Sequence, residues 1–171
     1  MLQIKAQKLS REACEKYGTY QDLLNDEELR NRSVFPHTFF ADLFTLEMGG
    51  NTLPTVSVCN PCRSCEGMIY RSLEAHECTS EGLLPIDDDI VIIAGKPGVP
   101  GEQSRFPAEN IEAFIVPQGT FVKLNPYISH AGQYPVHKDS AHVLCLLPAR
   151  TFNNDMLLFT LDEEEAIKVV F

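Results

Sequence analysis

The chain has no tryptophan and few basic residues: 14 Lys and Arg stand against 24 Asp and Glu among 171 residues. The formal net charge of −10 argues against nucleic acid or an anionic membrane surface as a partner, because both bind basic surfaces. No apolar run approaches the about 20 residues that a membrane helix needs, and the longest, Val143–Leu147, is far too short. The opening MLQIKAQKLS has no signal-peptide hydrophobic region. We therefore expect a soluble, cytoplasmic protein.

Six cysteines without an export signal favour reduced thiols in the cytoplasm. Cys59, Cys62 and Cys65 have the spacing C-x2-C-x2-C, and Cys78 follows thirteen residues later. This spacing is compatible with a zinc knuckle or with part of an iron–sulfur site. A ferredoxin-type run would add a fourth cysteine followed by proline, and none follows Cys65. We favour reduced loop thiols, with zinc binding by this loop as the alternative.

The length predicts one domain spanning residues 1–171, and the spacing of turn residues along the chain predicts a mostly β fold. Helical signals are confined to the part before about residue 33, where Ser10 is a plausible N-cap and Gly18 a plausible helix end. Gln21–Arg32 reads as a second short helix or a loop. The remaining chain consists of short apolar runs divided by turn residues, which is typical of antiparallel sandwiches and barrels. The candidate strands are Leu2–Lys8, Thr38–Met48, Thr55–Cys59, Ile69–His76, Ile90–Ala94, Ile111–Val116, Thr120–Leu124, Ala141–Leu147, Met156–Leu161 and Ile167–Phe171.

Two carboxylates and two imidazoles form the candidate site. Glu74 and His76 are two residues apart, so on a strand both side chains point to one face. Glu81 follows after a Cys-Thr-Ser break that could turn the chain back, and His130 ends a later strand-like run. Such a set could ligate a divalent metal or perform acid–base chemistry. The alternative is a solvated strand face, since E-x-H pairs are frequent.

An all-β chain with E-x-H on one strand pair and P-x-x-x-H on another resembles the cupin (RmlC-like) superfamily, and within it the ureidoglycolate lyase family. That family's pattern of Leu-Glu-x-His, then Gln or Glu, then hydrophobic-Pro-hydrophobic is similar to Leu73, Glu74, His76, Glu81 and the run Leu84-Pro85-Ile86. The opening KLSREACEKYG and the acidic end Asp162–Glu165 also resemble the family. The family's second motif carries a His and a Trp-His-His run, of which this chain keeps only His130.

The resemblance implies a double-stranded β-helix, or jelly-roll barrel, that assembles as a homodimer. It implies a divalent metal, Mn, Fe, Ni or Zn, held by Glu74, His76, Glu81 and His130. The runs Leu84-Pro85-Ile86 and Val116-Pro117 are expected to enter strands, where proline is tolerated. Five further residues are candidates for binding the substrate: Arg63, Tyr70, Lys123, Asn125 and Tyr134. His37, His137 and His142 are expected to be solvated or hydrogen-bonded.

Three functions remain open. The first is a ureidoglycolate-lyase-like enzyme acting on a small polar metabolite such as a hydroxy acid, with Glu81 or Glu74 as base and the metal as electrophile. The second is a sugar isomerase or epimerase of the cupin type, in which a carboxylate such as Glu81 moves a proton. The third is a cupin that binds a small molecule without catalysis. We favour an enzyme.

Overall fold

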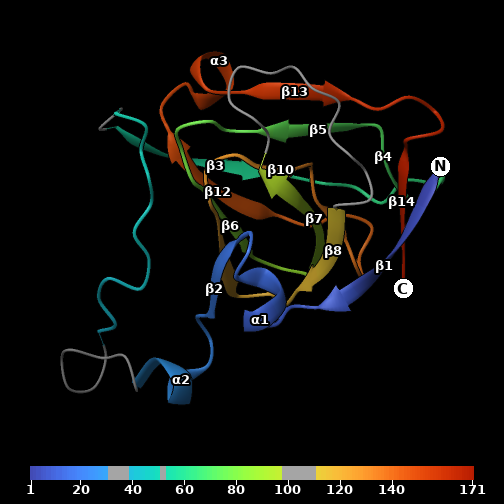
Figure 1. Ribbon diagram of the computed structural model, residues 1–171. Helices are drawn as coiled ribbons and strands as arrows, with labels where there is room; N and C mark the ends of the chain where they lie inside the picture. Colours follow the sequence, from blue (N-terminus) through green and yellow to red (C-terminus); the bar gives the residue numbers. More distant parts are fainter. Residues whose placement is uncertain (31–38, 51–52, 98–110) are drawn as a thin grey trace.

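The computed structural model describes residues 1–30, 39–50, 53–97 and 111–171, and these form an all-β fold with three short helices (Figure 1). The predicted fold class is therefore confirmed. Ser10 caps the first helix as expected, because its side chain accepts a hydrogen bond from the backbone N–H of Ala13 at 3.3 Å. No helix among the described residues has the length and apolar character needed to cross a membrane. The helices are α1 (Arg11–Cys14), α2 (Asp26–Arg30) and α3 (Thr151–Asn154).

The larger of two sheets has nine strands, in the order β13-β5-β10-β7-β8-β1-β14-β4, with β11 also paired to β7. Its strand β1 runs parallel to both β14 and β8, so the expectation of purely antiparallel sheets is wrong for this strand. Parallel neighbours need a long connection, and most of the chain separates β1 from both partners. The strands are β1 (Leu2–Lys8), β4 (Met68–Tyr70), β5 (Ser72–Ala75), β7 (Ile90–Pro97), β8 (Ile111–Val116), β10 (Ile128–His130), β11 (Tyr134–Pro135), β13 (Leu157–Thr160) and β14 (Ile167–Val170).

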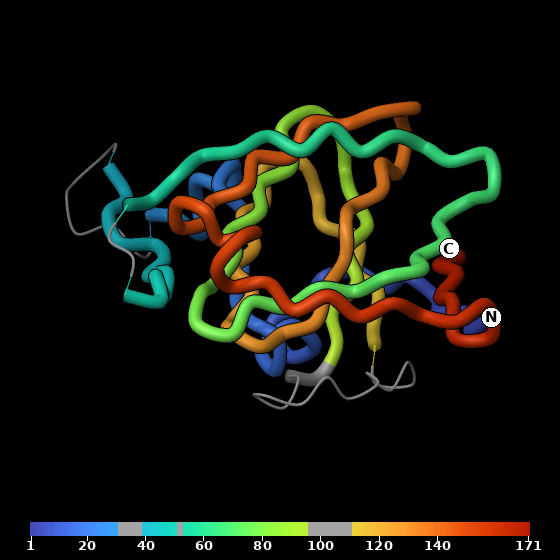
Figure 2. Tube along the Cα trace, turned by 90° about the horizontal axis from the view of Figure 1, so that it is seen from above, coloured from blue at the N-terminus to red at the C-terminus, as the bar shows by residue number. Residues whose placement is uncertain are grey.

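The smaller sheet has five antiparallel strands in the order β2-β9-β6-β12-β3. Viewed from above, β3 runs along one side of the molecule and the β5–β13 pair along the other (Figure 2). The strands are β2 (Gly18–Asp22), β3 (Pro54–Cys59), β6 (Glu81–Pro85), β9 (Thr120–Leu124) and β12 (Val143–Pro148).

Two apolar cores lie on opposite faces of the β7–β8 part of the larger sheet. Ile90 and Ile92 belong to the core between the two sheets, together with Leu83 of β6. Val91 and Ile93, which alternate with them, belong to a second core formed within the larger sheet itself. Burial of both faces explains why the run Ile90–Ala94 is apolar at every position.

Several predicted elements differ in the structure. The strand predicted for Thr38–Met48 is wrong for residues 39–48, where only Met48 forms an isolated bridge, to Thr79; Thr38 lies outside the described residues. The aromatic content of this segment serves side-chain packing instead, since the rings of Phe44 and Phe121 lie 4.5 Å apart on the smaller sheet. Helix α3 lies beyond residue 33, contrary to the prediction, because a single turn is too short to leave a helical period in the sequence.

Strand boundaries also differ. The run Ile69–His76 is divided at Arg71, because β4 pairs with β14 and β5 pairs with β13. Pro85 and Val116 end their strands rather than begin them, so the expected strand entry at these prolines is wrong; the missing N–H of proline is tolerated at either end. Gly18 starts β2 instead of ending a helix.

Candidate metal centre

His76, Glu81 and His130 are brought together between the two sheets. His76 directly follows β5, His130 ends β10 in the same sheet, and Glu81 begins β6 in the smaller sheet. Nε2 of His130 lies 2.7 Å from Oε2 of Glu81, and Nε2 of His76 lies 3.6 Å from the same oxygen. All three side chains are buried, with exposed fractions of 2%, 6% and 3% in chain order. Their potential ligand atoms lie within 4.8 Å of one another, close enough for one ion to touch all three.

Both imidazoles are oriented by backbone carbonyls. Nδ1 of His76 lies 2.8 Å from the carbonyl oxygen of Asp155, and Nδ1 of His130 lies 2.8 Å from that of Ile128. A carbonyl only accepts, so each Nδ1 carries a proton, and in the neutral imidazole the lone pair is on Nε2. This outer hydrogen bond is the usual support of a metal-ligating histidine.

The three inward atoms are unsatisfied. Nε2 of His76, Nε2 of His130 and Oε2 of Glu81 have no hydrogen-bond partner within the described part of the chain. The 2.7 Å approach of Nε2 of His130 to Oε2 of Glu81 is an ion pair and is not counted among the hydrogen bonds. Buried polar atoms without partners are rare and indicate an unfilled role. Lone pairs that converge on one point suit a cation placed between them.

Charge in the cluster is strongly coupled. Burial by itself would raise the pKa of the Glu81 carboxyl, but the imidazoles of His130 and His76 outweigh burial and lower it. Burial would likewise lower the pKa of His130, yet the Glu81 carboxylate outweighs it and raises that pKa. Without a cation, the pair is therefore an imidazolium and a carboxylate. A bound cation would replace the His130 proton as the partner of Glu81.

Glu74 lies at the edge of the cluster. It faces His130 directly across the β5–β10 ladder, and its Oε1 is 3.7 Å from Nε2 of His130. Its side chain is 24% exposed, unlike the three buried residues. Glu74 is thus near enough to interact with the site while remaining open to solvent. The structure brings all four predicted residues together, with three forming the tight group.

The proposed turn between His76 and Glu81 differs from the expectation. The intervening residues do not fold the chain back within one sheet but carry it from the larger sheet to the smaller one. Glu81 consequently faces the histidines from the opposite wall. Asp155 and Phe152, which the sequence analysis missed, border the site: Asp155 bonds His76, and the Phe152 ring stands edge-on to the His76 ring at 6.3 Å. Neither residue lies in a motif that would have signalled this position.

Lys123 and Asn125 lie away from the cluster. In β9 the side chains of Val122 and Leu124 enter the core, so Lys123 occupies the outer face. There its Nζ lies 2.7 Å from a carboxylate oxygen of Glu47. Asn125 is exposed, and its backbone N–H donates to the carbonyl of Tyr17 at 2.9 Å.

Arg63, Tyr70 and Tyr134 lie on the other side of the larger sheet. Tyr70 and Tyr134 pack in the second core, with their rings 5.0 Å apart, whereas the cluster lies on the face of the first core. The exposed Arg63 donates to the carbonyl of Val136 at 2.7 Å. The five residues predicted to bind substrate therefore do not line the cluster in this structure.

The cysteines do not form a second metal group. His76, Glu81 and His130 are the metal-type group found in residues 1–30, 39–50, 53–97 and 111–171. All six cysteines are free thiols, and Cys62, Cys65 and Cys78 are exposed. Cys59 is half-buried beside the first core, where burial, followed by the carboxylates of Glu81 and Glu74, raises the pKa of its thiol.

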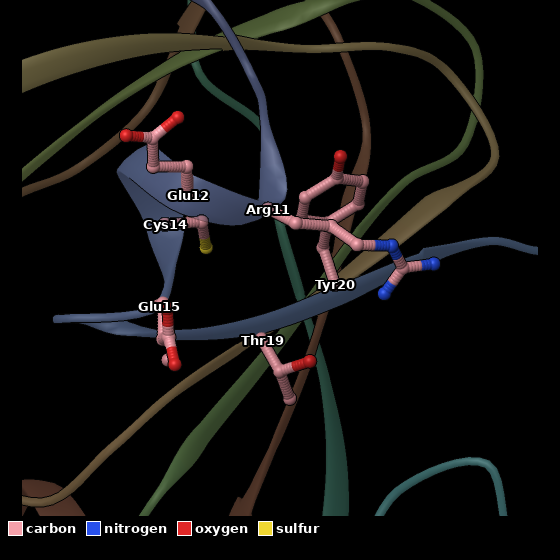
Figure 3. Close-up of a pocket in the computed structure, with 7 residues that line it drawn as sticks. Arg11, Glu12, Cys14, Glu15, Thr19 and Tyr20 are labelled. Carbon is pink, nitrogen blue, oxygen red and sulfur yellow. The ribbon is translucent and has the colours of Figure 1, made fainter.

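A hollow of about 510 Å³ lies between α1 and β2 (Figure 3). The Arg11 guanidinium stands over the Tyr20 ring at 5.5 Å, and burial raises the pKa of the Cys14 thiol to about 11. No residue of the His–Glu cluster lines this hollow. The convergent ligand atoms found among the described residues lie elsewhere, in the His–Glu cluster, so size alone does not make this hollow the site.

Comparisons with known proteins give a fold but no family. A dTDP sugar isomerase from Desulfovibrio desulfuricans has a similar structure, with a TM-score of 0.50 and 9% identity over 75% of this chain and 74% of that one. This chain has the RmlC-like cupin fold. RmlC from Streptococcus suis, solved with dTDP-D-xylose, matches with a TM-score of 0.42 and 15% identity over 74% of this chain and 55% of that one. No protein-family model and no curated protein matches the sequence. At these identities, the cupin likeness concerns the fold alone.

Proposed function

We propose that this cupin is an enzyme that moves a proton on a small, oxygen-rich metabolite, a sugar or hydroxy acid, beside a divalent cation. The observation that carries the proposal is the convergence of three buried ligand atoms, from His76, Glu81 and His130, that have no hydrogen-bond partner among the described residues. The proposal includes a single functional domain over residues 1–171 and a soluble, cytoplasmic protein whose partners are small molecules.

The residues present fit a cation. Two imidazole nitrogens and one carboxylate oxygen form the donor set that suits Fe²⁺, Mn²⁺, Ni²⁺ or Zn²⁺, and Glu74 offers a further oxygen nearby. When bound, such an ion would polarise a substrate oxygen as a Lewis acid. The carbonyls of Asp155 and Ile128 keep both Nε2 atoms available for it.

The two carboxylates suit different roles. The neighbouring imidazoles lower the pKa of Glu81, and a carboxylate that holds protons so weakly is a poor base. Glu74 is partly open to solvent and lies beside the same histidine, so a substrate in the site could reach it. We therefore assign Glu74 as the base that removes a carbon-bound proton and returns it, and Glu81 as a ligand.

A sugar isomerase or epimerase is better supported than a ureidoglycolate lyase. The similar fold of a dTDP sugar isomerase supports the first, whereas the lyase rests on the sequence resemblance. Arg63, Tyr70, Lys123, Asn125 and Tyr134 remain predictions as substrate-binding residues. Their positions outside the cluster give them no support.

The test is proton exchange in D₂O. The protein loaded with Mn²⁺ is incubated with dTDP-sugars and with ureidoglycolate, and deuterium incorporation and urea release are followed by NMR. We expect deuterium at one sugar carbon, and Glu74→Gln should slow its incorporation about 100-fold or more. The exposed Glu66, paired with Arg71, supplies the control Glu66→Gln, which should retain the parent rate. Urea release without exchange would identify a lyase. The absence of both signals would indicate a binding protein.

We also propose a homodimer formed through the outer face of the smaller sheet. Val56 and Val58 of β3 are 67% and 60% exposed there. In the ladder they lie beside Leu146 and Leu144 of β12, and Leu144 lies beside Leu84 of β6. These outer positions carry no charge on a protein of net charge −10, so a second copy can approach without repulsion.

Sedimentation at micromolar concentration tests this interface. Val58→Lys should convert a dimer to a monomer, because the substitution would bury a charge. Leu158→Lys, at an equally exposed leucine in the other sheet, should leave the dimer intact. A monomeric parent protein would refute the interface.

A further inference from the structure

We propose that Asp155 is a positioning residue for the candidate metal centre, which it serves by fixing the ring of His76 and the backbone that leads to Glu81. The inference rests on the proposed function. Asp155 directly follows α3, and its backbone N–H donates to the carbonyl of Thr151 at 2.8 Å. Asp155 is far in sequence from His76 and Glu81 and is not one of the candidate ligands.

The main chain of Asp155 orients the imidazole. Its carbonyl oxygen lies 2.8 Å from Nδ1 of His76, the hydrogen bond that leaves Nε2 free. His76 has an exposed fraction of only 2%, so water cannot easily replace this acceptor. The carbonyl therefore determines which nitrogen of His76 faces Glu81.

The side chain of Asp155 holds the adjacent backbone. Oδ1 accepts the N–H of Glu77 at 2.8 Å, and Oδ2 accepts the N–H of Cys78 at 3.1 Å. Oδ2 also accepts the Thr79 hydroxyl at 2.9 Å. These three residues form most of the connection from His76 to Glu81. Asp155 thus forms hydrogen bonds both with the His76 ring and with the segment that joins the two sheets at the site.

This arrangement matters because His76 and Glu81 lie in different sheets. Their relative position depends on the connection between them, whose N–H groups would otherwise be unpaired at a turn. Outer hydrogen bonds of this kind typically change metal affinity about 10- to 100-fold when removed. His130 supplies an internal comparison, since its Nδ1 bonds the carbonyl of Ile128 in its own strand and is independent of Asp155.

A carboxylate suits this position better than an amide. Asparagine at residue 155 keeps one acceptor oxygen for the Glu77 N–H but turns an NH₂ group toward the second pair of donors. The Thr79 hydroxyl can rotate to accept, whereas the Cys78 N–H cannot. Asp155→Asn should therefore preserve part of the function, and Asp155→Ala should lose it.

The experiment compares Asp155→Ala and Asp155→Asn with the parent protein and with Asp88→Ala. Asp88 is a matched control, because its Oδ2 accepts the N–H groups of His137 and Lys138 at 2.9 Å in a turn outside the cluster. Zn²⁺ affinity is measured by titration, thermal unfolding by circular dichroism, and the solvent exchange of the imidazole Nδ1–H protons of the metal-free protein by NMR.

We expect Asp155→Ala to weaken Zn²⁺ binding about 10- to 100-fold, and Asp155→Asn to weaken it less. The carbonyl at residue 155 remains in Asp155→Ala, but its backbone is no longer held to residues 77–79. The Nδ1–H of His76 should therefore exchange with solvent faster than in the parent, while that of His130 is unchanged. Asp88→Ala should lower the unfolding temperature without changing Zn²⁺ affinity. If Asp155→Ala fails to fold, Asp155→Asn carries the same comparison.

An unchanged exchange rate of the His76 Nδ1–H in the Asp155 variants would overturn the inference, as would Zn²⁺ affinity within twofold of the parent. A parent protein that binds no Zn²⁺, Mn²⁺, Fe²⁺ or Ni²⁺ would instead refute the proposed metal function. In that case the exchange measurement, which needs no metal, still decides whether Asp155 positions His76.

Discussion

Alanine in place of His130 is expected to abolish metal binding at micromolar concentrations, a loss of about 100-fold or more in affinity. Even partners outside the ligand set change affinity about 10- to 100-fold, and His130 supplies one of the three convergent donors found among the described residues. The metal-free variant should also unfold more easily, by roughly 3 kcal/mol, because the buried carboxylate of Glu81 loses its nearest cationic partner. Metal content and urea denaturation measure the two effects.

The control for this variant is His142→Ala. His142 is half-exposed, and its imidazole pairs with the carboxylate of Asp87 at 2.7 Å. This variant therefore also removes an imidazole that contacts a carboxylate. It should leave the metal content unchanged and lower the stability far less than His130→Ala does, because solvent screens an exposed pair. Equal metal content in the parent and in His130→Ala would show that the cluster is not the metal centre.

The same variant should lose a characteristic pH dependence. The pKa of Glu81 is lowered from 4.5, so its stabilising contribution is complete above 4.5 and is lost as the pH falls through the lowered value. The pKa of His130 is raised from 6.5, so its contribution is complete below 6.5 and is lost as the pH rises through the raised value. The difference in stability between metal-free parent and His130→Ala should therefore be greatest between pH 4.5 and 6.5.

Metal affinity should increase with pH. Below the raised pKa of His130, a proton must leave the imidazole before it can bind a cation. The affinity of the parent should thus increase with pH, by up to about tenfold per unit for one released proton. An affinity that does not depend on pH from 5 to 7 would contradict a role for His130 as ligand.

Gly18→Ala is expected to destabilise the fold by about 3 kcal/mol or more. A Cβ at this position would lie 1.8 Å from the backbone carbonyl oxygen of Lys123, in the neighbouring strand β9. A carbonyl in a sheet cannot move aside as a side chain can, so β2 would have to separate from β9. Losses of this size arise from few causes, and forced overpacking is one of them.

Gly132→Ala is the matched control, because among the described residues, its two chain neighbours apart, no atom lies within 4 Å of the Cβ that it would add. We expect a change within about 0.5 kcal/mol, since open positions tolerate alanine. Urea denaturation of both variants measures the difference. If the free energy of unfolding of Gly18→Ala is within about 1 kcal/mol of that of the parent, the pairing of β2 with β9 is incorrect.

Local periodicity carries much of the fold and of the site. The alternation of Glu74 and His76 around a buried Ala75 places both on one strand face, and this follows from strand geometry whatever the topology. The apolar run Ile90–Ala94 likewise predicts a central strand. Ser10 predicts a helix start because its side-chain oxygen accepts a hydrogen bond from the backbone N–H three residues later, an interaction that depends on local sequence alone.

The sequence pattern by itself therefore predicted a mostly β fold and named the four residues that gather together, and the resemblance to cupins added the jelly-roll barrel. Only the tertiary structure decided that Glu81 faces the histidines from the opposite sheet, that Lys123 points outward to Glu47, and that Asp155 holds His76. Alternation repeats every two residues and indicates which side chains share a strand face. It contains no information on which sheet a strand joins or which face turns inward, because these depend on pairings between residues far apart in the chain.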